Sequence, residues 1–458
     1  MQAYQDLPRA FLFYVYDRRE YYLSRKEMYM DAVTITLAFL VFAIVMFAWE
    51  KIPLSITAMI VAVGLTLTGV LTPMEAFKGF VDQNVLLFFG MFIIGAAFFE
   101  TGMAVAVGRV VSKFAKNETQ LLIAVMLLTG FMSAFLSNTG TAAVMIPVVI
   151  GIAKETNTSP QRLLMTIVFA SAMGGNISLI GSPGNMIGQS ALIAKGLEPF
   201  SFFEYGYIGI PMLLIGTLFC AFIGKRFLPT DAAHRPEITY TRNYHYDRVP
   251  MWKKVTSGLV LSGTVLAMIF DKQLGAIFGL SGGLPLFVSS WIGALIIVAT
   301  GVLSEKQAME AIDLKTILLF VGSLALGDAM VKSGAGSVIA DTIMGLVGVS
   351  APPFLIIGIL LILCVSMTNF MSNTATCALL IPIGIQLAHT MNFDPHGVTA
   401  AIVLGSSLAY GTPVGMPANT MVYNAAGYSF REFVKAGTPL ILVSVIVTMV
   451  LLPIFFPF

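Results

Sequence analysis

Two stretches of the sequence, FLSNTGTAAVMIP at 135–147 and FMSNTATCALLIP at 370–382, are near copies of each other. Eight of their thirteen positions are identical, and the offset between them is 235 residues. In both copies a polar Ser-Asn-Thr triplet separates two apolar runs, and Ile-Pro closes the stretch. Self-similarity of this kind predicts two structurally related halves, each built around one triplet.

A second pair of motifs extends the repeat towards the end of each half. LIGSPGNMI, which contains residues 181–185, returns as PVGMPANTMV, which contains residues 415–419, at an offset of 234 residues. We call 181–185 and 415–419 the first and second Gly-Pro motifs. The repeat thus covers residues 31–228 and 255–458.

The composition is that of a membrane protein. Of the 458 residues, 57% are hydrophobic and only 11% are charged, and the mean hydropathy is +0.87. A soluble globular protein carries about 25% charged residues. The basic residues are scattered singly or in pairs through polar links, so the sequence offers no basic face for nucleic acid. We therefore expect a multi-pass protein with the lipid bilayer as its surroundings.

Apolar runs of sufficient length predict the membrane crossings. A hydrocarbon core about 30 Å thick needs roughly 20 apolar residues in a helix. Two long apolar regions contain the Gly-Pro motifs, and we predict that each is a broken crossing. The ten predicted crossings are 31–49, 53–71, 84–102, 161–195 (broken), 205–228, 255–270, 285–303, 314–331, 397–428 (broken) and 434–457.

The runs beside each triplet are too short to cross comfortably. Residues 121–136 and 140–153 flank the first triplet, and residues 354–371 and 375–389 flank the second. The shorter limbs would be about 21–24 Å long as helices. We predict two re-entrant hairpins, which are tolerated within a bilayer only where they line protein or a wet cavity. The triplets would be the hairpin tips.

A basic linker sets the predicted orientation. Residues 229–254 and their flanks carry a concentration of Lys and Arg, which the positive-inside rule places in the cytoplasm. Each half has an odd number of crossings, so the two repeats are antiparallel, as in many secondary transporters with sites at the midplane. Counting five crossings back from the cytoplasmic linker places residues 1–30 outside the cell, where we expect an interfacial segment rich in Tyr and Phe.

The tips and the Gly-Pro motifs offer polar groups for a binding site. Each tip presents backbone N–H groups, hydroxyls and an amide at the positive end of a half-helix, which attracts anions. Carbonyls at the opposing helix ends suit a hard cation such as sodium. No Lys, Arg, Asp or Glu occurs within 121–153, 163–194 or 354–393. An anion bound there must be neutralised by helix ends and by co-bound cations or protons.

Other functional classes have less support in the residues. A proton relay normally needs an intramembrane carboxylate, and Glu50, Glu100 and Asp328 lie at or near predicted span ends, where we expect structural roles. An intramembrane enzyme would need a base near the tip serines, and none is near in sequence. An anion channel would not need paired hairpins. The three cysteines and four histidines have no metal-ligand spacing, so we expect no cofactor.

Two Ser-Asn-Thr tips, each followed by a Gly-Ser/Thr-Pro-Pro-Asn-like motif, resemble the divalent-anion:sodium symporter family of di- and tricarboxylate transporters. The resemblance covers residues 31–458. It implies an all-α integral membrane protein with two inverted-topology repeats, re-entrant helical hairpins and broken transmembrane helices. It also implies a homodimer in the plasma membrane, whose transport part slides against a scaffold like an elevator. The cargo would be a carboxylate such as succinate, malate, fumarate, 2-oxoglutarate or citrate, together with sodium ions.

The same resemblance divides the chain into parts with different tasks. These are the scaffold at 31–102, an arm at 103–118, the transport part at 119–228, the linker at 229–254, a second scaffold section at 255–334, a second arm at 335–350 and a second transport section at 351–458.

Residue roles also follow from the resemblance, position by position. The substrate carboxylates would be bound by Ser137, Asn138, Thr139, Ser182, Pro183, Ser372, Asn373, Thr374, Met416 and Pro417. Sodium would be bound by Ser133, Ser137, Asn138, Gly181, Thr368, Asn373 and Gly415. The sequence departs from the family pattern at Gly184 and Ala418, where a second proline is usual, and at Met416, where a hydroxyl residue is usual. Some members exchange one carboxylate for another without sodium, so obligate exchange is the alternative.

Overall fold

The computed structural model of the chain describes residues 32–47, 49, 51–106, 117–156, 158–229, 249–280, 283–347 and 351–458. Every regular element within these ranges is a helix, which confirms the all-α class. The predicted interfacial segment, most of the linker and much of the first arm lie outside the described residues.

The helices lie along both halves of the chain. The first half contains a first helix (Ala32–Phe47), α2 (Leu54–Leu67), α3 (Pro73–Phe77), α4 (Gln83–Glu100), α6 (Glu118–Ser133), α7 (Asn138–Thr156), α8 (Pro160–Gly174), α9 (Pro183–Ala194) and α10 (Gly206–Leu218). The second half contains α11 (Met251–Ile269), α12 (Asp271–Ile277), α13 (Leu286–Ala299), α14 (Glu305–Glu310), α15 (Leu314–Ser333), α16 (Ala335–Val347), α17 (Pro353–Thr368), α18 (Asn373–Thr390), α19 (Pro395–Ser406), α20 (Pro417–Ala426) and α21 (Phe430–Phe455).

Several predicted crossings are shorter than expected. Within the described ranges, four helical stretches are long and apolar enough to span a membrane: Pro73–Glu100, Gly206–Arg226, Leu314–Ser333 and Phe430–Phe455. α11 and α12 give a fifth if their 84° bend is counted within one span. Length and composition therefore support fewer full-length spans than the ten predicted. One physical reason is that Gly69 and Gly301 adopt positive φ, so α2 and α13 end before the apolar runs do.

The two predicted broken crossings are interrupted at their Gly-Pro motifs. α8 and α19 end before the motifs, irregular backbone follows, and Pro183 and Pro417 begin α9 and α20. Proline is well suited to a first helical position, because its missing N–H is not needed there and its fixed φ matches the helix.

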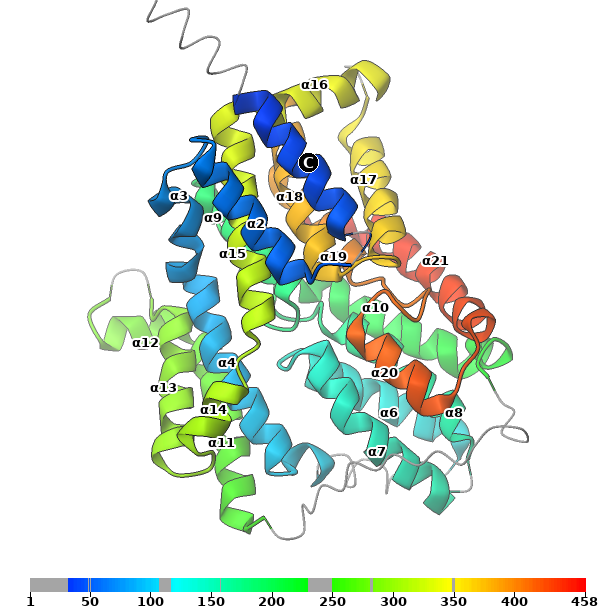
Figure 1. Ribbon diagram of the computed structural model, residues 1–458. Helices are drawn as coiled ribbons and strands as arrows, with labels where there is room; N and C mark the ends of the chain where they lie inside the picture. The colour runs from blue at the N-terminus through cyan, green and yellow to red at the C-terminus, as the bar shows by residue number, and fades with distance from the viewer. Residues whose placement is uncertain are drawn as a thin grey trace, which may run out of the picture.

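The helices pack in two groups, each drawn from both halves of the chain, and the two groups contact each other chiefly through α15 and α18 (Figure 1). In one group α2 packs against α15, and α4 packs against α13 and α11. In the other group each hairpin contacts a broken crossing: α6 and α7 pack on α8, and α17 and α18 pack on α19. Helices of the two halves also interleave here, since α20 contacts α7 and α9 contacts α18.

Candidate functional site

The two hairpin tips bring two helix N-termini to one cavity. α7 begins at Asn138, directly after Ser137, whose Oγ accepts a hydrogen bond from Gly140 N at 3.1 Å. α18 begins at Asn373, with Ser372 as its N-cap residue. Both tips line one cavity of about 530 Å³, which we call the tip cavity. Because the first N–H groups of a helix lack intrahelical partners, the cavity faces two sources of positive potential.

All of the residues predicted to bind substrate line the tip cavity: Ser137, Asn138, Thr139, Ser182, Pro183, Ser372, Asn373, Thr374, Met416 and Pro417. The sequence did not predict the opposite wall, which comes from the other group of helices. That wall consists of Pro53, Leu54, Ser55, Phe92, Ala311, Asp313, Lys315, Thr316 and Leu319. The cavity therefore lies between the two packing groups.

A cluster of oxygen atoms lies behind the first tip. The fully buried Ser133 Oγ is 2.7 Å from Asn138 Oδ1 and 2.8 Å from the carbonyl oxygen of Ser171. A hydroxyl has one hydrogen to donate, so it cannot satisfy both acceptors at once. Gly175 closes the cluster, since a Cβ there would lie 2.6 Å from Asn138 Oδ1.

The second half repeats this cluster around the fully buried Thr368. Its Oγ1 is 2.9 Å from Asn373 Oδ1 and 2.5 Å from the carbonyl oxygen of Ser406. With the Asn373 amide turned over, its nitrogen would donate to Thr368 Oγ1 at 2.9 Å and to the carbonyls of Gly415 and Ser406 at 3.2 Å. Several acceptors thus converge on one point, which an amide nitrogen or a cation could fill.

Most of the predicted sodium ligands lie in or beside these clusters: Ser133, Asn138, Thr368, Asn373 and Gly415. Gly181 approaches the first cluster, since a Cβ on it would lie 2.6 Å from the carbonyl of Gly175. Ser137 places its hydroxyl at the tip instead, where it caps α7 through Gly140 N.

Two asparagines that we had not assigned to the site brace the irregular segments. Asn185 Nδ2 donates to the carbonyls of Gly175 and Ser178 at 2.8 and 2.7 Å. Asn419 Nδ2 donates to the two carbonyls at the equivalent positions of the second half, at 2.6 and 2.8 Å. Both asparagines occupy the last position of a Gly-Pro motif, so the repeat alignment contained the signal. Each amide fixes the path of the chain between two half-helices.

Two of the three departures from the family pattern have visible consequences. A Cβ on Gly184 would lie 2.7 Å from Cys377 Sγ, so the cysteine occupies the space that a proline ring would need. Met416 is 4% exposed and adds an apolar side chain to the wall of the tip cavity. The equivalent position in the first half is the polar Ser182. Nothing in the structure explains Ala418.

The remaining chemical groups have structural roles. Asp328 forms an ion pair with Lys78 at 2.9 Å, as expected for a structural carboxylate, whereas Glu50 lies outside the described residues. The three cysteines are free and buried: Cys220, Cys364 and Cys377. In the part of the chain that the structure describes, no group of three His, Cys, Asp or Glu side chains could hold a metal ion.

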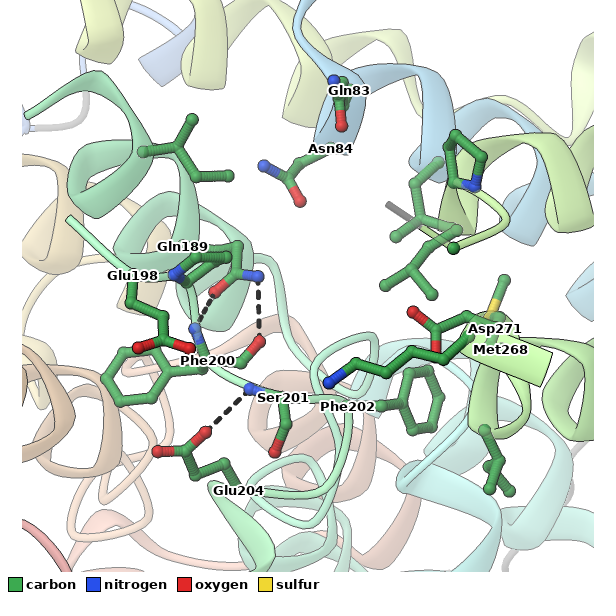
Figure 2. A pocket seen from close by; sticks show the side chains of 18 of the residues that line it. Gln83, Asn84, Gln189, Glu198, Phe200, Ser201, Phe202, Glu204, Met268 and Asp271 are labelled. Carbon is green, nitrogen blue, oxygen red and sulfur yellow. Dashed lines mark hydrogen bonds between the residues drawn. The ribbon is translucent and has the colours of Figure 1, made fainter. Parts of the chain in front are cut away.

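A second cavity, of about 1040 Å³, contains none of the predicted site residues. It is lined by the start of α4, the end of α9, α12, the loop before α10 and the C-terminal residues. Figure 2 shows Gln189 and Phe200 beside it, joined by hydrogen bonds of 3.0 and 2.8 Å, and Ser201 N donating to Glu204 Oε2. Its lining mixes charged, polar and apolar side chains, and neither Ser-Asn-Thr tip contributes to it.

An all-α fold with apolar helices of membrane length, and with a cavity between two packing groups that both Ser-Asn-Thr tips line, is typical of membrane transport proteins. The family model described as "Citrate transporter" matches residues 44–392 and 370–458, and the chain belongs to this family. The predicted membership of the divalent-anion:sodium symporters is confirmed, and the protein is a transporter, not an enzyme.

Individual relatives support the same class. An uncharacterized transporter of Haemophilus influenzae is 29% identical over 90% of this chain and 89% of its own length. The sodium-dependent dicarboxylate transporter SdcS of Staphylococcus saprophyticus is 25% identical, over 93% of this chain and 85% of its own. Among solved structures, Neisseria gonorrhoeae MtrF has a TM-score of 0.64 at 14% identity, over 92% of this chain and 94% of its own, which indicates a shared fold.

Proposed function

We propose that this protein is a secondary active carrier of di- or tricarboxylate anions, coupled to sodium ions. The observation that carries the proposal is the tip cavity, where two Ser-Asn-Thr tips and two helix N-termini face one space. Carboxylate oxygens accept hydrogen bonds from hydroxyl, amide and backbone N–H groups, and charge-assisted bonds of this kind are the strong ones. A volume of about 530 Å³ suits a small organic acid.

The two oxygen clusters support sodium as the coupling ion. Ser133 and Asn138 in one cluster, and Thr368 and Asn373 in the other, offer more acceptors than their hydroxyl hydrogens can satisfy. Sodium bound there would supply positive charge next to each tip. A buried dianion without such compensation would be strongly disfavoured. The relative SdcS is named a sodium-dependent dicarboxylate transporter.

The proposed mechanism is an elevator movement of two inverted repeats in a plasma-membrane homodimer. The transport part would comprise the hairpins, the broken crossings and the helix that closes each half, and α16 would be one of the arms. In the orientation that we predict from the basic linker, Pro53 and Asp313 would lie at the cytoplasmic ends of α2 and α15. The tip cavity, which both residues line, would then open towards the cytoplasm in this conformation.

Obligate carboxylate exchange is the second candidate, and two observations favour it. The Asn373 amide nitrogen, in its turned orientation, fills the acceptor cluster without any ion. Met416 also removes a hydroxyl from the wall beside that cluster.

The experiment that separates these functions is uptake of labelled succinate, malate, 2-oxoglutarate and citrate into liposomes containing the purified protein. Symport predicts saturable uptake that needs an inward sodium gradient. Exchange predicts uptake only into vesicles preloaded with carboxylate, regardless of sodium. Flux that neither saturates nor shows trans-stimulation would indicate a channel and contradict both proposals.

A further inference from the structure

A lysine lines the tip cavity from the wall that faces the tips. Lys315 lies in the first turn of α15 and is the one Lys or Arg among the residues that line this cavity. Its side chain is exposed, and no carboxylate of the described residues lies within 4.0 Å of its Nζ. The charge of this ammonium group is therefore available to a ligand.

The neighbouring Asp313 does not neutralise Lys315 by direct pairing. Asp313 Oδ1 accepts from the backbone N of Lys315 at 3.1 Å and from the backbone N of Thr316 at 3.3 Å. Its Oδ2 accepts from Thr316 Oγ1 at 2.6 Å. The carboxylate is thus engaged in capping α15, where its charge offsets the positive end of the helix.

Helix stability does not explain a lysine at this position. A cation in the first turn opposes the helix dipole, at a cost of about 0.3–1 kcal/mol. The start of α4, in the first half of the chain, can be compared with the start of α15 in the second. Asp82 caps α4 by accepting from Asn84 N, just as Asp313 caps α15 through Lys315 N. The residue two positions after the cap is a neutral amide there, and its Nδ2 is bonded to Ser190 Oγ at 2.6 Å. A residue that breaks a local rule without a structural gain is a candidate for a functional role.

We propose that Lys315 is a positioning residue that attracts the substrate to this mouth of the tip cavity and favours anions of higher charge. This inference rests on the proposed function, because it concerns the same site and the same class of carboxylate ligand. The helix ends at the tips contribute partial charges, whereas Lys315 contributes a full one from the opposite wall. Coulomb attraction grows in proportion to the charge of the ligand, so a trianion gains more from Lys315 than a dianion does.

The test is equilibrium binding of succinate and citrate to the full-length protein in nanodiscs, at fixed sodium and low ionic strength, for Lys315→Met, Lys315→Arg and Lys306→Met. Lys306 is the matched control because it is exposed, belongs to α14 and does not line the tip cavity. Lys315→Met should weaken succinate binding about fivefold and citrate binding about tenfold, the ratio following from ligand charge. Added choline chloride should shrink both losses, since the lysine is exposed to solvent. Lys315→Arg and Lys306→Met should stay within about twofold of the parent.

Three results would overturn the role of Lys315: unchanged affinities in Lys315→Met, equal losses for the two ligands, or the same losses in Lys306→Met. Asn138→Ala, measured in parallel, separates this inference from the proposed function. If Asn138→Ala weakens binding about ten- to hundredfold while Lys315→Met does not change it, only the inference fails. If Asn138→Ala also binds normally, the tip cavity is not the substrate site and both fail.

Discussion

Removing the hydroxyl of Ser133 tests the coupling ion most directly. In Ser133→Ala, Asn138 Oδ1 and the carbonyl of Ser171 lose the group that lies 2.7 and 2.8 Å from them. If sodium occupies this cluster, the variant also loses one ligand of the ion. An interaction between a polar group and a charged one is worth about 1.5–3 kcal/mol, so losing this ligand weakens sodium binding by about that amount. We therefore expect the sodium concentration for half-maximal activation to rise about ten- to 150-fold.

The assay is carboxylate binding as a function of sodium concentration, with choline replacing sodium. Thr368→Ala should behave in the same way through the second cluster. At saturating sodium both variants should regain most of the parent affinity for the carboxylate. Linkage requires the reverse effect also, so added carboxylate should tighten sodium binding by the same factor.

A matched control is available on the same helix. Thr129 is fully buried on α6, and its Oγ1 has no hydrogen-bond partner among the described residues, so Thr129→Val removes a hydroxyl away from the cluster. Its sodium dependence should equal that of the parent. Equal carboxylate affinity in sodium and choline for the parent protein would refute the reasoning, as would an unchanged sodium dependence in both Ser133→Ala and Thr368→Ala.

Three further outcomes are expected. Asn138→Ala and Asn373→Ala should each lower carboxylate affinity about ten- to hundredfold while the protein remains folded, because each removes a charge-assisted hydrogen bond worth about 1.5–3 kcal/mol; near-normal uptake by both would contradict the site. Met416→Thr should tighten carboxylate binding about two- to tenfold, because it places a hydroxyl on the cavity wall; weaker or unchanged binding would show that the missing hydroxyl at this position does not limit the affinity. In a background without native cysteines, a cysteine in 229–254 should react only from the cytoplasm and one at Gln2 only from outside; opposite labelling of the linker would reverse the assigned orientation.

The parts of the candidate site that repeat in the two halves could be predicted from the sequence. The duplicated triplets predicted two tips, and all the predicted substrate residues line one cavity because the halves interleave around it. The hydroxyls at Ser133 and Thr368 were assigned from the family resemblance, and they hold equivalent positions before the two tips. Repetition identifies such residues even when each motif alone would be an ordinary helix cap.

Features without a repeated partner were not predicted. Lys315 has Asn84 as its counterpart, so the alignment of the halves gave no reason to select it. The wall that contains Lys315 also comes from residues far from either tip in the sequence, and only packing places them together. The ends of the short helices depended on single glycines with positive φ, such as Gly69 and Gly301, which hydropathy does not detect.

The interleaving of the two halves has a consequence for how the protein is made. α7, which carries the first tip, packs against α20, and α9 packs against α18, with Gly184 set against Cys377. The ribosome completes α7 and α9 long before α18 and α20 exist. Until then the first tip has its partners on α6 and α8 but lacks its contacts with α20 and the cavity that it later lines, and exposed polar backbone is costly in lipid. We therefore expect the first half to remain beside the insertion machinery or near the membrane interface until the last helices are inserted.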